Sequence, residues 1–206
     1  MKGIIGRKIG MTQYFRPDGT HVACTIIEAG PCKVIQKKTV ETDGYDSVQI
    51  GYGVRKESRT TNAQKGHFKK HNSDSMQVVR EIRDFDLEKE SGDEITIEIF
   101  AEGDRVSVEG VSKGKGFQGV VKRHGFAGVG MATHGQHNRE RAPGSLGAGS
   151  YPSRVFKGMR MAGRMGSDKI TLKKVPVEKV IAEKNIIYIK GAVPGRKGSI
   201  VMIKKN

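Results

Sequence analysis

The chain has few of the features that mark disulfide-rich, zinc-binding or membrane-spanning proteins. Only two of its 206 residues are cysteines, Cys24 and Cys32, and they form no CxxC motif. We therefore expect no structural disulfide and no zinc site, but two buried, reduced thiols. No run of 18 apolar residues is present, and the opening MKGIIGRKIGM has no apolar stretch followed by a cleavage site. These absences predict a cytosolic protein without a membrane-spanning helix.

Acidic residues are also scarce. The chain carries 22 Asp and Glu against 37 Lys and Arg, which gives a formal net charge of +15. Such a field attracts polyanions, so the composition indicates nucleic acid or an anionic membrane surface as partner. A length of 206 residues is enough to bury a substantial core, either as one domain or as a body with a smaller inserted unit.

The shortage of acids is greatest between Ser112 and Gly166. This segment contains ten Lys or Arg and a single acid, Glu140, so it contributes +9 of the net charge, and it holds 13 of the 28 glycines. Between Gly125 and Gly166 we find neither a helical apolar stripe nor a sustained strand alternation. A connection of roughly 40 residues far exceeds the usual length of about 4 to 6, and such loops are usually functional or disordered.

The same segment has few large apolar side chains with which to stabilise a fold of its own. Ordering a residue's backbone costs roughly 1 to 2 kcal/mol, which apolar burial cannot offset here. Its guanidinium, ammonium, imidazole and glycine backbone groups can instead bind closely spaced phosphates. We predict that an external polyanion orders the segment. The candidate RNA-binding residues are Lys113, Lys115, Lys122, Arg123, His134, His137, Arg139, Arg141, Arg154, Lys157, Arg160 and Arg164.

The first third of the chain reads as β-strands joined by tight turns. Pro17-Asp18-Gly19 separates two β-prone runs, which is typical of a hairpin because Pro presets φ and Gly accepts positive φ. The stretch 61–71 lacks strand alternation and predicts a short helix with its N-cap at Thr61 or Asn62. Its lysines form either a basic binding face or a solvated surface; they are Lys65, Lys69 and Lys70.

Strands are predicted on both sides of the long glycine-rich segment. After a strand at 76–85, the run 94–100 alternates isoleucine with polar residues, and we expect it to form a hairpin with 105–111. Residues 169–205 read as short β-runs broken at Pro176, 183–185 and 194–195. Eight or more short strands are typical of a barrel or a sandwich, with the long segment inserted between two parts of one β body.

Catalytic and cofactor motifs are incomplete. The run GKGFQG at 114–119 matches the GxGxxG dinucleotide fingerprint, but Glu140, the acid at the required distance for a ribose, lies in a loop. We instead expect a phosphate-facing turn at a helix N-terminus. The Walker A spacing is absent, and Ser145 lacks the GxSxG elbow. We therefore predict neither an enzyme nor a bound cofactor, although a nucleotide-using enzyme and a free RNA chaperone remain alternative hypotheses.

The three histidines of the segment raise the question of a metal. His124, His134 and His137 are not part of an HExxH motif, and no Asp or Cys cluster accompanies them. Neighbouring cations oppose a bound metal. We expect these side chains to stack on bases or to hydrogen-bond to phosphate and ribose.

Several runs carry a family resemblance. They are KGKGFQGVVKRHGF, ATHG, PGSLGAGSYPSRVFKGMRMAGRMG, GRKIGMTQYF and KGAVPG. GRKIGMTQYF comes first in the chain, and the other runs follow in the order given, so that together they span nearly the whole chain. These runs resemble the bacterial large-subunit ribosomal protein L3 family. The resemblance implies a mainly β fold, with a translation-factor-like six-stranded β-barrel body at 1–111 and 167–206. It also implies the long loop; together with the residue patterns above, we expect a small inserted basic helical and strand unit at 55–90, and an RNA-binding helix with a long extended loop at 112–166.

The resemblance further implies a function. The expected role is that of a structural constituent of the large ribosomal subunit in the cytoplasm, which binds large-subunit ribosomal RNA near its 3′ end early in assembly. Neighbouring ribosomal proteins would be further partners, and no membrane or small-molecule substrate is expected. The loop tip would lie near the peptidyl transferase centre; it comprises Gly147, Ala148, Gly149, Ser150 and Tyr151.

Two details follow from the same resemblance. The cations that flank the tip would clamp the RNA backbone; they are Arg141, Arg154, Lys157, Arg160 and Arg164. Some bacterial members carry a methylated glutamine where this chain has Ser150. A serine cannot carry that modification, so we do not expect it here.

Overall fold

The computed structural model describes residues 2–85, 89–131 and 133–205. Positions 1, 86–88, 132 and 206 fall within the ranges assigned above to the body and the long loop, and they lie outside the described residues. The chain divides into two compact units, Met1–Val111 with Lys169–Asn206, and Ser112–Asp168. We call the first unit the body and the second the arm.

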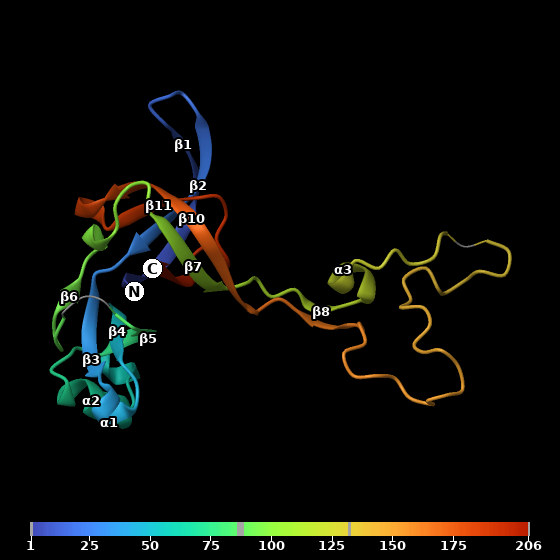
Figure 1. Ribbon diagram of the computed structural model, residues 1–206, viewed down its shortest axis with the longest axis horizontal. Coiled ribbons are helices and arrows are strands. Elements are labelled where there is room, and N and C mark those ends of the chain that lie inside the picture. The colour runs from blue at the N-terminus through green and yellow to red at the C-terminus, as the bar shows by residue number, and fades with distance from the viewer. Residues whose placement is uncertain (1, 86–88, 132, 206) are drawn as a thin grey trace. The chain divides into compact units, whose positions relative to one another are not determined.

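Antiparallel strands close a barrel in the body, in the order β1, β12, β7, β10, β11, β2 (Figure 1). Their bounds are Lys2–Phe15 for β1, His21–Ala29 for β2, Arg105–Val111 for β7, Lys169–Ile181 for β10, Ile186–Lys190 for β11 and Ile200–Lys205 for β12. This closure confirms the six-stranded barrel and excludes the sandwich. The predicted turn joins β1 to β2, where the Gly19 amide donates to the Arg16 carbonyl at 2.9 Å.

A second sheet packs on the barrel within the body. Its order is β5, β4, β3, β6, with β3 at Cys32–Lys38, β4 at Ser47–Val54, β5 at Met76–Arg83 and β6 at Glu94–Ile95. Ile4 and Ile5 point to opposite faces of β1, yet both are fully buried, because β1 is covered on both sides. A Cβ on Gly3 would lie 2.7 Å from Cδ1 of Ile82 in β5, so the missing side chain permits this close approach.

One apolar core spans the barrel and the second sheet. Ile27 and Val108 of the barrel belong to the same buried cluster as Val34 and Ile50 of the sheet. Burial of these β-branched side chains is the main favourable contribution to folding of the body. Both cysteines are buried and free, as predicted.

Short helices connect the strands of the second sheet. Helix α1 is Val40–Asp43 and helix α2 is Asn62–Lys70, while 3₁₀ turns occupy Glu57–Arg59, Ile97–Ile99 and Ala182–Lys184. The Thr61 side chain accepts from the Gln64 amide, and the Gln64 side chain accepts from the Thr61 amide. This capping box confirms the predicted helix and its N-cap.

The predicted hairpin between 94–100 and 105–111 was wrong. Strand β6 ends at Ile95 and pairs with β3, and the next residues form a 3₁₀ turn. A 3₁₀ turn places residues three apart on one side, so Ile97 and Phe100 both enter the core, which an alternating strand would not allow. The Ala101 amide then donates to the Asp104 carboxylate at 2.9 Å, and the chain turns into β7.

The predicted break at Pro176 was also wrong, because β10 continues through this residue. The strand pairs with β7 up to Pro176 and with β11 from Val177 onward. Its register shifts between Leu172 and Val175. A proline has no amide to donate, so it is tolerated where a strand changes partner beside a bulge.

Candidate nucleic-acid interface

The arm begins and ends between neighbouring strands of the barrel. Val111 at the end of β7 is the register partner of Lys169 at the start of β10. The Ser112 amide donates to the Asp168 carbonyl at 2.9 Å, and the Asp168 amide donates to the Ser112 hydroxyl at 3.1 Å. The two ends of the arm are thus fastened to each other.

A short region of regular structure follows these ends. Strand β8, Gly116–Gln118, pairs with β9, Gly163–Met165, and helix α3, Val120–His124, follows β8. We call residues 112–125 and 161–168 the neck. The five-residue α3 confirms a helix in this part of the chain, but β8 and Gly119 separate it from Lys113 and Lys115. The phosphate-facing turn predicted there stays a prediction.

Arg123 and His124 fasten the neck from α3. Arg123 Nη1 donates to the Met161 carbonyl oxygen at 2.6 Å, and His124 Nε2 lies 3.0 Å from the same oxygen. A Cβ on Gly163 would lie 2.5 Å from Arg123 Nη1, so a glycine is required for the side chain to lie there. Arg123, predicted to bind RNA, therefore makes an internal contact.

The remainder of the arm, residues 126–160, which we call the distal arm, has little structure of its own. The Val129 amide donates to the Glu140 carbonyl at 3.1 Å, and Thr133 and Gln136 exchange backbone hydrogen bonds of 3.2 and 2.9 Å. Across 112–131 and 133–168, Val120 in the neck is the one buried residue. The expected lack of a helix or sustained strand between Gly125 and Gly166 is confirmed over the described residues, where the three-residue β9 is the one named element.

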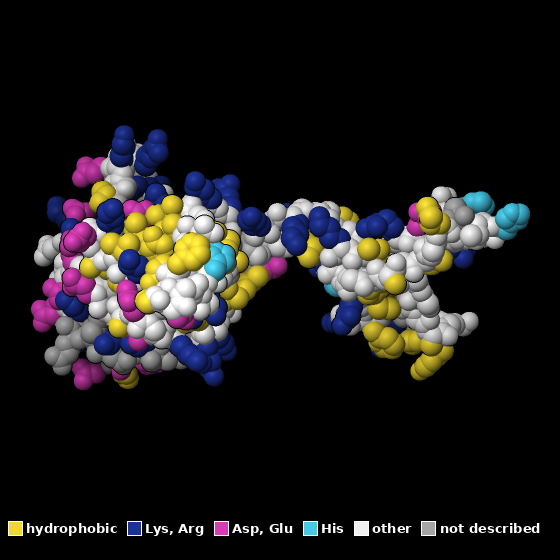
Figure 2. All heavy atoms as spheres, turned by 90° about the horizontal axis from the view of Figure 1, so that it is seen from above, with side chains coloured by type: hydrophobic (Ala, Val, Ile, Leu, Met, Phe, Trp, Pro, Cys, Tyr) yellow, Lys and Arg dark blue, Asp and Glu magenta, His cyan; other side chains and the backbone are white. Residues whose placement is uncertain are grey.

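The cations of the arm are uncompensated. Arg123 is half-buried, and the other nine Lys and Arg are exposed. Figure 2 shows Lys and Arg side chains at the surface of the arm. Within the described part of 112–168, none of the ten forms an ion pair with a carboxylate. The body differs, since Lys204 pairs with Glu109 at 3.3 Å and Lys205 with Asp104 at 2.6 Å. The positive charge of the arm thus lacks an internal counterpart.

The predicted site residues spread along the whole arm. Lys113 and Lys115 precede β8, Lys122 lies on α3, and Arg164 on β9 is opposite Phe117. The others lie in the distal arm, where His134 is inside the Thr133–Gln136 turn and His137 follows it; they are His134, His137, Arg139, Arg141, Arg154, Lys157 and Arg160. Among the described residues, no three His, Cys, Asp or Glu side chains gather as a metal site would require.

Exposed apolar and aromatic side chains lie between these cations. Phe117 is 77% exposed, Tyr151 at the predicted tip is 89% exposed, and Met131 is 86% exposed. The guanidinium of Arg154 lies 5.4 Å from the ring centroid of Phe156. At the tip, the Ser145 hydroxyl donates to the Gly147 carbonyl at 2.8 Å. Exposed aromatic faces beside cations can stack on unpaired bases while the charges bind phosphate.

Sequence reasoning missed how the neck is closed. Gly166 packs so closely against the Lys113 carbonyl that this position does not tolerate a Cβ. The abundance of glycine signalled close approach, but no local pattern indicated which backbone groups would meet, because the partners are far apart in the sequence.

Comparison with known proteins identifies the family. The model of the family described as ribosomal protein L3 matches residues 2–180. The chain belongs to the ribosomal protein L3 family. The large ribosomal subunit protein uL3 of Salinibacter ruber (strain DSM 13855 / M31) is 49% identical over 204 residues, which cover 98% of each chain. Within the described part of this L3-family chain, every helix is too short or too polar to cross a bilayer.

Proposed function

We propose that this L3-family protein is a structural constituent of the large ribosomal subunit and that its arm binds large-subunit ribosomal RNA. The observation that carries the proposal is the set of nine exposed cations on the arm, none of which is paired with an acid within the described residues. The name of the Salinibacter ruber relative, a large ribosomal subunit protein, supports the choice of particle.

Binding is electrostatic in this proposal. Each Lys or Arg that lies on a phosphate releases condensed counterions, and this release favours association at low salt. Folded RNA is recognised largely by its shape and backbone, so the arm needs no base-specific contacts. The exposed Phe117 and Tyr151 add stacking surfaces for unpaired bases.

The proposal also covers the stage of assembly at which the protein binds and its location in the large subunit. The protein binds early in assembly near the 3′ end of the large-subunit RNA, beside neighbouring ribosomal proteins, and the tip at 147–151 approaches the peptidyl transferase centre. The stretch from Gly125 to Gly166 has about 20 residues on each side, so as a fully extended hairpin it reaches at most roughly 65 Å. That reach is sufficient to extend from the surface of a large particle into its interior. The role is non-enzymatic and is carried out in the ribosome of the cytoplasm.

The salt dependence of RNA binding tests the role of the arm. We compare wild type with a fourfold glutamine variant of exposed distal-arm cations, Arg139→Gln, Arg141→Gln, Lys157→Gln and Arg160→Gln, on protein-free large-subunit RNA. A plot of the logarithm of affinity against the logarithm of salt concentration has a negative slope. For the arm variant this slope should be about 3 less negative than for wild type, because each lost phosphate contact removes about 0.7 to 0.9 from it.

The matched control changes four body cations by the same charge: Lys37→Gln, Lys89→Gln, Arg105→Gln and Lys184→Gln. We expect its slope to stay close to that of wild type. Equal slopes for the arm variant and the control would contradict the proposal. In sucrose gradients of a lysate, the protein should sediment with the large subunit, and sedimentation mainly in the free fractions would instead indicate an RNA chaperone.

A further inference from the structure

The body carries a second cationic surface, outside the arm. Residues 55–70 contain six Lys or Arg and one acid, Glu57. Arg55 is half-buried and the other cations are exposed; they are Lys56, Arg59, Lys65, Lys69 and Lys70. Within the described structure, none of the six forms an ion pair. On the adjoining sheet, by contrast, Lys33 pairs with Asp74 at 2.7 Å and Lys38 with Glu81 at 2.9 Å.

Five of these cations, all except Lys70, line two open hollows at the end of β4, which share Val54 and Arg55. The first measures about 450 Å³, and Lys65, Phe68 and Lys69 of α2 line one side of it. The second measures about 490 Å³ and is lined by Val54, Arg55, Lys56, Arg59 and Gln77. Val54 is 76% exposed between them. We call the two hollows together the β4–α2 groove.

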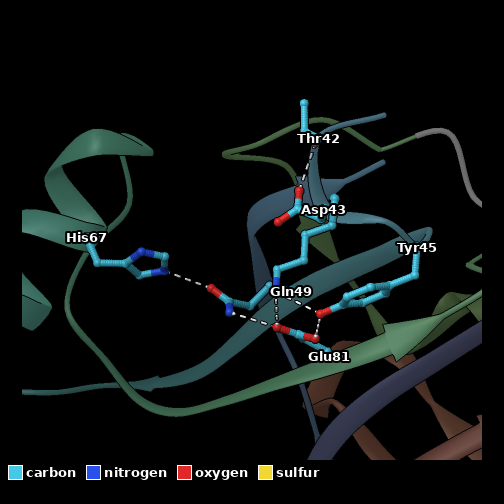
Figure 3. Close-up of polar contacts among 7 residues, drawn as sticks. Thr42, Asp43, Tyr45, Gln49, His67 and Glu81 are labelled. Atoms are coloured by element: carbon cyan, nitrogen blue, oxygen red, sulfur yellow. Dashed lines mark hydrogen bonds and ion pairs between the residues drawn. The ribbon is translucent and has the colours of Figure 1, made fainter. Parts of the chain in front are cut away.

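Helix α2 is held firmly on the sheet, so the groove is preformed. Phe68 is buried with Ile35 and Met76 on the inner face of the helix. His67 Nε2 lies 2.8 Å from Gln49 Oε1, and Gln49 Nε2 donates to Glu81 Oε1 at 3.4 Å (Figure 3). This chain of contacts connects α2 to β4 and β5. The backbone positions of the helix lysines are thereby set before any ligand binds.

The charge lining the groove is unbalanced. Lys65 and Lys69 lie four residues apart on one face of α2, where like charges repel each other. Glu57 and Asp74 line the first hollow, but Asp74 already pairs with Lys33. Among the described residues, no acid lines the second hollow. An anion in the groove would relieve this repulsion.

We propose that the β4–α2 groove is a second RNA-binding site, which holds one sugar–phosphate backbone independently of the arm. The inference rests on the proposed function, because both surfaces address the same RNA. Guanidinium forks and ammonium groups bind the phosphates, while Val54 and the aliphatic parts of the lysines contact ribose. Contacts of this kind position a protein on RNA without reading its sequence.

The first test is again salt dependence, with the full chain and protein-free large-subunit RNA as probe. The groove variant is Arg59→Gln, Lys65→Gln and Lys69→Gln. The control is Lys89→Gln, Arg105→Gln and Lys184→Gln, whose positions adjoin the acids Glu90, Asp104 and Glu183 in the sequence. Loss of three phosphate contacts should make the slope of log affinity against log salt concentration about 2 less negative. When the salt concentration rises from 50 to 200 mM, the affinity of wild type should therefore fall about 20-fold more than the affinity of the groove variant. Identical curves for the groove and control variants would overturn the proposal.

The second test locates the RNA. Ser58, between Lys56 and Arg59, is exposed, and a Ser58→Cys variant can carry a tethered iron chelate that generates hydroxyl radicals. The control tether is Ser91→Cys, in the acid-rich segment before β6. We expect RNA cleavage from position 58 and none from position 91, while the native thiols are buried and do not interfere.

The outcomes separate the two proposals. If wild-type protein fails to bind the RNA at all, the proposed function fails. If wild type binds but position 58 produces no cleavage and the groove variant behaves as the control, the groove proposal alone fails. The groove would then be assigned to an acidic segment of a neighbouring protein.

Discussion

Arg123 Nη1 donates a hydrogen bond of 2.6 Å to the carbonyl oxygen of Met161, and this bond joins two parts of the arm that are 38 residues apart in sequence. His124 adds a contact to the same oxygen at 3.0 Å. These contacts hold the neck closed in the absence of a partner, whereas the described residues of the distal arm make few contacts with one another. Amide exchange should therefore be slow in the neck and fast in the distal arm.

Gly163→Ala should open the neck. The new Cβ would lie 2.5 Å from Arg123 Nη1 and 3.0 Å from its Cζ, so the guanidinium must move away from Met161. Loss of about 1 kcal/mol of hydrogen bonding corresponds to about fivefold faster amide exchange in β8 and β9. Gly130→Ala, where a Cβ meets nothing within 4 Å, is the control. Unchanged exchange in Gly163→Ala would show that Arg123 does not hold the neck.

The distal arm should exchange its amides rapidly in the free protein. No described residue of 126–160 is buried, so we expect sharp NMR resonances and little protection there, against dispersed and protected resonances in the barrel. Addition of large-subunit RNA should protect the same amides. A distal arm that is already protected in the free protein would contradict the idea that RNA orders it.

Lys8→Met should destabilise the barrel. The Lys8 side chain is buried and its Nζ donates to the carbonyl oxygens of Val193 and Gly195 at 2.8 and 3.2 Å. Methionine fills a similar volume but leaves both carbonyls without this charged donor, which we expect to lower the free energy of unfolding by about 2 kcal/mol. Urea unfolding measures the change. The exposed Lys37→Met is the control, and equal stability of the two variants would exclude an anchoring role for Lys8.

Glu81 should make stability depend on pH. The Lys38 ammonium, with the Tyr45 hydroxyl, holds the pKa of the Glu81 carboxyl below its ordinary value. A carboxylate whose pKa is lower in the folded state stabilises the fold above the unfolded pKa of about 4.3, and this contribution is lost as the pH falls through the folded pKa. Glu81→Gln should therefore melt about 2 to 4 °C below wild type at pH 7, and the gap should narrow at pH 3.

The exposed Glu183→Gln is the control for this pH series. Its melting temperature should follow that of wild type at both pH values. A gap between Glu81→Gln and wild type that is as large at pH 3 as at pH 7 would rule out ionisation of Glu81 as the cause.

Deletion of residues 144–152 tests the role of the tip. The segment carries no cation and no buried residue, so RNA binding by the rest of the chain should persist. Ribosomes that contain the shortened protein should form peptide bonds more slowly or respond differently to drugs that act at the peptidyl transferase centre. Wild-type activity and drug response would count against a role for the tip there.

The sequence predicted well those features that depend on residues close together in the chain. The turn at Pro17-Asp18-Gly19 and the capping box at Thr61 depend on contacts within a few residues, so their sequence patterns are nearly sufficient. The barrel itself required more than local pattern, because alternation alone suits a sandwich as well. Family resemblance pointed to the barrel, and its closure is set by long-range pairs such as that between β1 and β12.

Features decided by distant partners were missed. The isoleucines at 95, 97 and 99 alternate as a strand does, but the core takes in Ile97 and Phe100 together through a 3₁₀ turn. Pro176 marks a change of strand partner, which depends on where β7 ends and β11 begins. For the arm, composition and the lack of periodicity predicted little regular structure, whereas the bond from Arg123 to Met161 depends on residues 38 positions apart.

Because Val111 pairs directly with Lys169, the barrel does not depend on the length of the arm inserted between them. Every residue between these two could be exchanged for a tight two-residue connection, and β7 and β10 would still be adjacent antiparallel strands. The same junction could accept a longer or shorter insertion without altering any other pairing in the barrel. Evolution could therefore change the length and sequence of the arm without changing the strand pairing of the barrel.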